Sequence, residues 1–507
     1  MAWIAFQLHT GIVLEDALIT FRFAENLATG RGFAFNAGEP VLGTTTPAFT
    51  LLLAALARLF GVAAIPVLAH VLLIGFAAVA VGCTARALRV AGCGEAAAAI
   101  AAFAIAFHPD VLWSTAGGME TMFVVALMAA SFETLARGRT VATGALVGVL
   151  VLARPDGIVW AGLALAATMA AGARAGLRAA LACVGVLTPW TAWATWMFGN
   201  PLPQSMLAKA VTVGPVDPLR LIRPSALRAA LAWGAEWLPY PPGPGLAGPG
   251  FVVGLVAVVA GAWCLVRPPR VPARVVVALF PLALALAYHV GAAPRAFPWY
   301  GVPATWALLV AGAVGAGVAF ETVRARPPAA SAWIAAGALA AGVAVAAAGV
   351  EVSRTIAYEK AFQENEIATR RVIGTWIDGH AAPGAIVAME AIGYQGTYAR
   401  RRIIDLAGLV TPEVTRLRRV SRSNAEVYRR VFADMRPGYI VLRSFEVDEN
   451  RHRDGGPFFE NAAAESAFRR SYVEVARRTA PHPRLWGGGA SLTIYEFQSA
   501  HSGEAVP

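Results

Sequence analysis

Residues 15–47 read EDALITFRFAENLATGRGFAFNAGEPVLGTTTP and begin with two adjacent carboxylates, Glu15 and Asp16, directly behind an apolar segment. Charged groups at a membrane boundary are costly and usually tied to function. The following residues 17–28 predict an amphipathic helix that lies in the membrane interface. Glycine-rich turns and the hydroxyls of Thr44, Thr45 and Thr46 come next. The alternative interpretation is that the two carboxylates only cap a helix N-terminus.

The composition is that of a membrane protein joined to a water-soluble part. Of the 507 residues, 57% are hydrophobic and 14% are charged, whereas about a quarter of an average soluble chain is charged. Residues 351–507 hold 22 basic and 19 acidic side chains, while the first 350 hold 20 and 12. We therefore expect two domains: residues 1–350 in the membrane, with a first outer loop over 15–46, and residues 351–507 as a soluble domain.

The net charge of +11 does not indicate a nucleic-acid partner. All but two of the 42 basic residues are arginine, in a chain rich in Ala and Gly, which is typical of a coding bias. The four cysteines lie in the apolar part without metal-ligand spacing, and neither CxxC nor HExxH occurs. The sequence thus excludes a zinc site of the CxxC or the HExxH type.

Apolar runs recur through the first 350 residues and predict about eleven membrane spans. Ten are assigned: 63–83, 95–108, 118–136, 140–153, 157–172, 179–197, 250–267, 273–291, 300–320 and 331–350. The N-terminal 14 residues are short for a span and lack a signal peptide's basic region, so we expect a truncated start or a tilted first helix. The run 47–61 is assigned provisionally as a half-span or interfacial helix.

Arginine pairs mark alternate turns between these runs, at 86–89, 137–139, 174–178, 267–274 and 324–326. Cytoplasmic loops collect positive charge, so the opposite turns and the C-terminal domain are expected outside the cytoplasm. That domain predicts a small α/β fold, with strands at 385–389, 402–406, 439–442 and 492–497. The fold class is therefore a polytopic α-helical membrane protein with a C-terminal extracytoplasmic α/β domain.

The first loop resembles the GT-C glycosyltransferases, and within them the bacterial group of the actinobacterial terminal arabinofuranosyltransferase. The resemblance rests on the carboxylate pair, on the segment FRFAENLATGRGFAFNAGE (21–39) and on the threonine-rich turn. Four later motifs resemble that group in the same order: GGMET (117–121), ARPDG (153–157), GNPLPQSMLAKA (199–210) and GYQGTYARRRIIDLAGL (393–409). Two positions depart from its pattern, since Glu15 replaces Asp and Gln204 replaces Asn.

The resemblance implies transfer of a sugar from a polyprenyl-phosphate donor to a hydroxyl acceptor on a cell-envelope glycan or lipid. A sugar hydroxyl is a poor nucleophile and needs a carboxylate to accept its proton. Asp16 is the expected base, with Glu15 beside it, and a single displacement inverts the anomeric carbon. Developing charge on the leaving phosphate needs cations or hydrogen-bond donors, for which the candidates are Lys209, Arg154, Arg295 and Tyr300.

The residues expected to contact the acceptor or the sugar are Glu120, Asp156, Gln204, Thr45 and Asn36. Some members of the family bind a divalent metal at this place, so the resemblance leaves metal dependence open; a bound Mg²⁺ or Mn²⁺ would have Asp16 and Glu120 as its ligands. Several alternatives stay open. Glu120 is equally explained as a helix N-terminal carboxylate, Arg154 and Asp156 as a structural ion pair, Tyr300 and Trp299 as interfacial aromatics, and Asp405 as a turn cap.

The predicted protein is an enzyme of the bacterial plasma membrane that acts at its outer face. Its partners are the lipid bilayer, a polyprenyl-phosphate sugar and a glycan or lipid acceptor, without nucleic acid. The rival hypothesis is a non-enzymatic transporter or scaffold for lipid-linked glycans. A transporter is expected to carry ionisable or broken segments at mid-membrane, whereas the polar residues here gather at the span ends.

Overall fold

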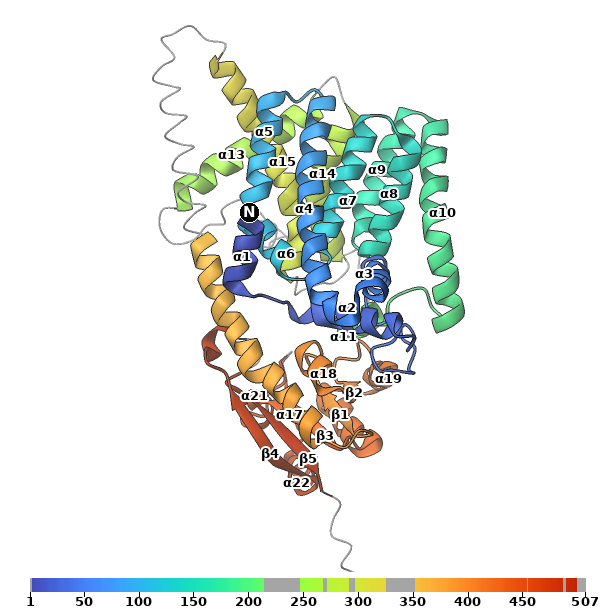
Figure 1. Cartoon of the computed structure of the whole chain (residues 1–507), viewed down its shortest axis with the longest axis vertical. Coiled ribbons are helices and arrows are strands. Elements are labelled where there is room, and N and C mark those ends of the chain that lie inside the picture. Colours follow the sequence, from blue (N-terminus) through green and yellow to red (C-terminus); the bar gives the residue numbers. More distant parts are fainter. Residues whose placement is uncertain are drawn as a thin grey trace, which may run out of the picture.

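The computed structural model describes residues 2–213, 247–267, 271–290, 297–324, 352–453, 455–486 and 489–498. A bundle of apolar helices forms one part of the molecule, and a smaller α/β domain lies against one end of it (Figure 1). The first half of the bundle consists of α1 (Ala2–Thr10), α2 (Glu15–Ala28), α3 (Pro47–Phe60), α4 (Ile65–Val90), α5 (Glu95–Phe107), α6 (Pro109–Ala116) and α7 (Thr121–Ala136). The second half consists of α8 (Thr140–Ala153), α9 (Gly157–Ala171), α10 (Ala173–Phe198), α11 (Gln204–Val213), α13 (Ala247–Val266), α14 (Pro272–Val290) and α15 (Pro298–Arg324).

The helices follow the predicted apolar runs, but many are shorter than a full span. In the described residues three helical segments are long and apolar enough to cross a membrane, Val62–Val90, Ala173–Phe198 and Pro298–Arg324. Two bent pairs, α1 with α2 and α5 with α6, raise the number to five if each pair is one span. The structure thus supports a membrane protein without confirming eleven spans. The predicted span 331–350 lies outside the described residues.

One detail of the bundle differs from the sequence prediction, and two short predicted helices are present. The turn expected between residues 108 and 118 contains a helix, α6, which is bent by 52° from α5. The first predicted interfacial helix begins at Glu15, and α2 lies across the lower ends of the long helices in Figure 1. The run 47–61 forms α3, a helix of 14 residues, which is shorter than the roughly 20 residues of a span.

Small residues let the helices of the bundle approach closely. A Cβ atom on Gly144 of α8 would lie 2.0 Å from the carbonyl oxygen of Ala179 on α10. A Cβ on Gly317 of α15 would lie 2.7 Å from the backbone nitrogen of Ala97 on α5. Helix packing in membranes is driven by such close van der Waals contact. The high Ala and Gly content therefore has a packing role in addition to any coding bias.

Two buried tryptophans join five helices in the centre of the bundle. The Trp160 ring lies 5.5 Å from that of Trp306 and 5.3 Å from that of Phe280. Their indole nitrogens donate to Ser131 Oγ, at 2.8 Å, and to Thr84 Oγ1, at 3.0 Å. Because both polar atoms are satisfied, these large side chains can be fully buried. This cluster holds α4, α7, α9, α14 and α15 together.

The C-terminal domain is built on a five-stranded mixed sheet. Its strands are β1 (Ile386–Met389), β2 (Arg402–Asp405), β3 (Tyr439–Arg443), β4 (Tyr472–Thr479) and β5 (Ser491–Phe497), in the order β2-β1-β3-β5-β4. β1 pairs in parallel with β2 and β3, with Val387 opposite Ile403 and Tyr439, whereas β5 pairs antiparallel with β3 and β4. The α/β prediction is confirmed, and all four predicted strands are present.

One strand, β4, is missing from the sequence prediction. Its residues YVEVARRT are mostly exposed, with Glu and Arg side chains on an edge strand. Charged side chains protect an edge from pairing with another chain, and they also remove the apolar run by which a buried strand is recognised. The helical elements of the domain are a continuous stretch over 352–380, then α18 (Tyr394–Ala399), α19 (Pro412–Val420), α20 (Asn424–Arg430), α21 (Ser444–Val447) and α22 (Ala462–Ser471).

Close packing at Gly144 leads to a stability prediction. Gly144→Ala forces α8 away from α10 and is expected to destabilise the protein by about 1–3 kcal/mol, as overpacking usually does. Thermal unfolding of the detergent-solubilised chain measures the loss as a lower Tm. Gly162→Ala on α9 is the control, because a Cβ there meets nothing within 4 Å. Equal Tm values for the two variants would contradict the predicted contact.

Candidate active site

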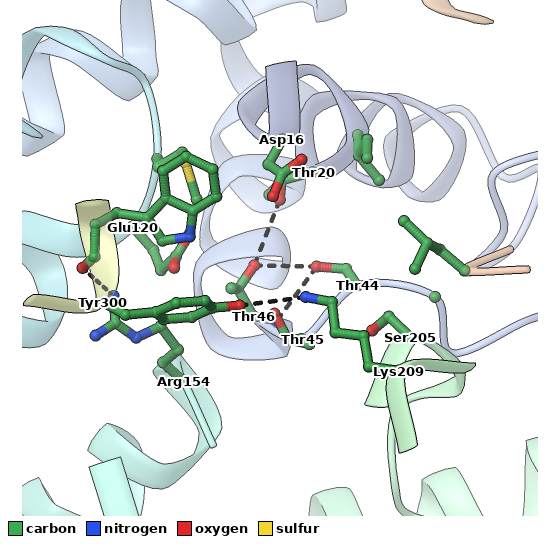
Figure 2. Close-up of a pocket in the computed structure, with 15 residues that line it drawn as sticks. Asp16, Thr20, Thr44, Thr45, Thr46, Glu120, Arg154, Ser205, Lys209 and Tyr300 are labelled. Carbon is green, nitrogen blue, oxygen red and sulfur yellow. Dashed lines mark hydrogen bonds between the residues drawn. The ribbon is translucent and has the colours of Figure 1, made fainter. Parts of the chain in front are cut away.

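A pocket opens where α2, the threonine-rich turn and α11 meet the end of the bundle, and Figure 2 shows its lining. It has a volume of about 550 Å³ including its open mouth. Most of the predicted site residues that the structure describes are gathered here. The lining comprises Asp16, Ile19, Thr20, Gly43, Thr44, Thr45, Thr46, Met119, Glu120, Arg154, Ser205, Lys209, Trp299, Tyr300 and Leu409.

Asp16 enters the pocket from the first turn of α2. The chain bends by 96° between α1 and α2, and the amide of Leu14 donates to the carbonyl of Gly117 at 2.9 Å. A carboxylate in the first helical turn is favoured by the helix dipole. The same bend brings the loop that carries Glu120 against the start of α2.

Glycines 117 and 118 allow this close approach. A Cβ on Gly117 would lie 2.6 Å from Leu14 Cδ1, and Gly118 has a φ of +82° and packs against Ala17 and Phe21. Glu120 directly precedes α7, as predicted, and is 2% exposed. Asp16 and Glu120 therefore both face one pocket from different elements.

Threonine hydroxyls form one wall of the pocket. Thr46 Oγ1 lies 3.0 Å from Thr44 Oγ1 and 3.4 Å from Thr20 Oγ1. Gly43 packs so tightly between Phe23 and Val410 that a Cβ would lie 2.7 Å from the valine. The predicted substrate residue Thr45 lies between these held positions and lines the pocket.

Two cations face the carboxylates across the pocket. Lys209 Nζ donates to the Tyr300 hydroxyl at 3.2 Å and lies 5.8 Å from the centre of its ring. Burial lowers the pKa of Lys209, but the Tyr300 oxygen and the carboxylates of Asp16 and Glu120 outweigh it, so that the pKa is raised. Lys209 thus remains charged in the pocket.

Arg154 is both a lining residue and half of an ion pair. It is 2% exposed, and its Nε and Nη2 donate to the Asp156 carboxylate at 2.7 and 2.8 Å. A third nitrogen donates to the carbonyl of Trp299 at 3.2 Å, while Asp156 also accepts from the Tyr288 hydroxyl at 2.8 Å. The structural ion pair expected from ARPDG is therefore present, and Asp156 holds Arg154 in place at the pocket wall.

Three predicted site residues instead bind the C-terminal domain. Glu15 accepts hydrogen bonds from the amides of Gly393, at 2.5 Å, and Tyr394, at 3.0 Å. Asn36 exchanges two hydrogen bonds of 2.9 Å with the backbone of Ile403 on β2. Gln204 donates to the carbonyl of Gly408 at 3.2 Å and to Thr415 Oγ1 at 2.8 Å.

The turn after β2 brings the C-terminal domain into the pocket. Asp405 is the last residue of β2, and its buried carboxylate accepts from the amides of Ala407, Leu409 and Val410. It therefore caps the turn, as the simpler sequence interpretation expects. Leu409, from this turn, lines the pocket. Burial raises the pKa of Asp405 to about 6 in spite of these hydrogen bonds.

The predicted phosphate-binding residue Arg295 lies outside the described residues. The sequence interpretation did not assign Ser205, Thr20, Met119 or Leu409 to the site. Ser205 had a recognisable signal, since it precedes Lys209 by four residues and shares its helix face. Leu409 had none, because its place depends on how two distant domains dock.

Metal ligands are few in the part of the chain that the structure describes. It contains no cluster of three or more His, Cys, Asp or Glu side chains arranged to hold an ion. Asp16 and Glu120 line the same pocket, however. Mg²⁺ is commonly held by one or two carboxylates together with substrate phosphates. Asp16 and Glu120 therefore fit a metal whose remaining ligands come from a substrate.

Comparison with known proteins identifies the fold. Residues 354–495 match a domain of unknown function, DUF8728, and no curated protein matches the sequence significantly. The structure of ArnT from Cupriavidus metallidurans in the apo state has 14% identity and a TM-score of 0.57, over 97% of this chain and 95% of ArnT. The same protein bound to undecaprenyl phosphate has 15% identity and a TM-score of 0.57, over 99% and 97%.

A third structure is the archaeal oligosaccharyltransferase AglB from Archaeoglobus fulgidus, in complex with an inhibitory peptide and a dolichol-phosphate. It has 12% identity and a TM-score of 0.55, over 97% of this chain and 71% of AglB. The chain therefore shares the fold of ArnT and AglB, which supports the GT-C fold that the first-loop motifs predict.

The contact of Glu15 with Gly393 can be tested by substitution. A Cβ on Gly393 would lie 2.0 Å from the Glu15 carbonyl oxygen, so Gly393→Ala is expected to weaken docking by about 1–3 kcal/mol. Hydrogen exchange of residues 390–400 in the full chain should become faster. Gly379→Ala, where a Cβ meets nothing within 4 Å, is the control. Unchanged exchange in Gly393→Ala would show that this contact does not hold the domain.

Asp405 predicts a pH dependence of stability. Its folded pKa of about 6 lies above the ordinary 3.8, so between these values the folded state binds more protons and stability falls as pH rises. Asp405→Asn removes this fall. Thermal unfolding from pH 4 to 7 should therefore show that the Tm of the variant, relative to wild type, increases with pH. A constant difference between Asp405→Asn and wild type across this range would disprove the assignment.

Proposed function

We propose that the protein is a membrane glycosyltransferase that moves a sugar from a polyprenyl-phosphate donor to a hydroxyl acceptor, with inversion at the anomeric carbon. One observation carries the proposal. In a GT-C fold, the carboxylates of Asp16 and Glu120 and the cations of Lys209 and Arg154 line a single pocket. A carboxylate can accept the proton of the attacking hydroxyl, and cations can stabilise the charge on the leaving phosphate. The pocket therefore contains groups for both roles.

Asp16 is the proposed general base. The acceptor oxygen attacks the anomeric carbon while its proton passes to the Asp16 carboxylate. The bond between that carbon and the phosphate oxygen breaks, and the lipid phosphate leaves with the electron pair. Lys209 and Arg154 stabilise the negative charge that develops on the phosphate. Tyr300 positions the Lys209 ammonium through its hydroxyl.

Glu120 and Thr45 are the proposed contacts for sugar or acceptor hydroxyls, because both line the pocket. Asp156, Asn36 and Gln204 act indirectly, by holding other groups in place. Asp156 positions Arg154, and the two amide residues hold the C-terminal domain over the pocket. Glu15 fixes the start of α2, and therefore the direction of Asp16, by its bonds to Gly393 and Tyr394.

A divalent metal, Mg²⁺ or Mn²⁺, would be held by Asp16 and Glu120 together with the substrate phosphate. When bound, it would neutralise charge on the leaving group. The role of Lys209 does not depend on it, because its ammonium already faces both carboxylates and the Tyr300 oxygen.

The proposed location is the bacterial plasma membrane, with the pocket and C-terminal domain on the outer face. The turns after α4, α7 and α9 carry the arginine pairs and lie at the end of the bundle opposite the C-terminal domain (Figure 1). By the positive-inside rule that end is cytoplasmic. A cell-envelope glycan or lipid is the proposed acceptor, and the transferred sugar is a hexose or a pentose.

The rival is a transporter or scaffold that binds lipid-linked glycans without chemistry. The pocket, with its carboxylates and cations, is formed at the end of the described bundle that faces the C-terminal domain, where both α2 and α11 lie (Figure 1). Substrate sites of transporters lie near the middle of the membrane. The position of the pocket therefore favours catalysis at the surface.

Asp16→Asn tests the enzyme hypothesis directly. Purified full-length protein is incubated with a panel of polyprenyl-phosphate sugars and envelope glycans, and released polyprenyl phosphate is measured. Loss of a general base costs typically a factor of 10² to 10⁴ in rate, so the variant should lose at least 99% of its activity. Its expression and Tm should be close to wild type.

The matched control is Glu25→Gln, on the same helix but outside the pocket, where Glu25 lies near Arg22. It should retain wild-type activity. A fully active Asp16→Asn would refute the assigned base. Binding of the lipid donor without any release of phosphate, in wild type and variants alike, would favour the transporter.

A further inference from the structure

The hydroxyl of Ser205 is a buried polar group in the wall of the pocket. Ser205 is 5% exposed, and its Oγ has no hydrogen-bond partner among the described residues. It nevertheless lines the pocket together with Lys209, and Figure 2 shows the two side chains next to each other. A buried hydroxyl without a partner is unfavourable, so this one indicates a group that arrives from outside the protein.

Helix α11 holds Ser205 at a fixed place. Its first amide, of Gln204, donates to the Leu42 carbonyl at 2.7 Å, and those of Met206 and Leu207 donate to the Pro203 carbonyl. The Gln204 side chain is bound to the C-terminal domain. These contacts fix the first turn from two sides, and a fixed donor gains more from a ligand than a mobile one.

The first turn of a helix also favours negative charge. The positive end of the dipole lies here, and Ser205 and Lys209 are four residues apart, hence on one face. A neutral donor and an ammonium on one face of a helix start suit an oxyanion. The carboxylates of Asp16 and Glu120 lie in the same pocket but on other elements, and they disfavour an anion close to themselves.

We propose that Ser205 donates its hydroxyl hydrogen bond to a phosphate oxygen, beside the Lys209 ammonium, and that this turn of α11 binds a phosphate monoester. The inference rests on the proposed function and assigns to it a further substrate-binding residue. The phosphate belongs either to a polyprenyl lipid or to a free phosphate compound. Both sources share the same chemistry, and the experiment separates them.

Binding of undecaprenyl phosphate to the full-length protein in nanodiscs tests the proposal. Ser205→Ala should raise the Kd about tenfold, because hydrogen bonds to charged groups are the stronger ones. Ser205→Thr keeps the hydroxyl and should restore part of the affinity. The Tm of ligand-free Ser205→Ala should equal or exceed that of wild type, since the variant removes an unpartnered buried hydroxyl. A merely structural serine would instead lower it.

The control is Ser114→Ala on α6. Ser114 is also buried with an unpartnered Oγ among the described residues, but it is not part of the pocket lining. This variant should leave the Kd unchanged. Undecaprenol, which lacks phosphate, and inorganic phosphate serve as the other two ligands. Weak undecaprenol binding that is insensitive to Ser205→Ala is expected if the hydroxyl contacts the phosphate.

The outcomes distinguish the two levels of the hypothesis. An unchanged Kd for undecaprenyl phosphate in Ser205→Ala overturns the role of Ser205 and leaves the glycosyltransferase standing. Binding of inorganic phosphate alone, dependent on Ser205, supports the phosphate site and overturns the lipid as its source. Failure of wild type to bind either ligand overturns both. Normal binding with inactive wild type contradicts only the proposed transfer reaction.

Discussion

The pair of hydrogen bonds from the Gly393 and Tyr394 amides to Glu15 is the contact on which the site depends. It joins the first turn of α2 to the C-terminal domain, almost 380 residues later in the chain. Successive residues on a helix point about 100° apart, so when Glu15 is held by the domain, its neighbour Asp16 faces the pocket. The two adjacent carboxylates therefore have different surroundings, and only Asp16 is a lining residue.

The C-terminal domain consequently acts as part of the site. Asn36, Gln204 and Glu15 bind it at three places around the first loop, and Leu409 closes the pocket from its side. Val410 packs so closely against Gly43 that there is no room for a side chain at position 43. This arrangement gives the domain of unknown function a structural explanation: without it, the bend before α2 and the threonine-rich turn would each lose a fixed support.

Much of the fold and site was predictable from local patterns. Apolar runs predict the helices and the strands β1, β2, β3 and β5. The family resemblance and the arginine-bearing turns together predict that Asp16, Glu120, Arg154 and Lys209 lie on one side of the membrane. The features that local patterns do not predict depend on distant contacts. Span length is not fixed by a run's apolar character, β4 has a charged exposed edge, and the partners of Asn36 and Gln204 lie more than 200 residues away.

Two of the residues that local reasoning placed in the site carry a charge that their neighbours in the sequence do not explain. Lys209 is one of only two lysines in the chain and belongs to an otherwise uncharged segment, and Asp16 follows a hydrophobic one. Asn36 and Gln204 are polar without charge, and such residues are readily satisfied by a backbone partner from another domain. A buried charge needs a counter-charge or a substrate. Asp16 and Lys209 accordingly line the pocket, whereas Glu15, Asn36 and Gln204, whose polar groups bind the C-terminal domain, serve assembly.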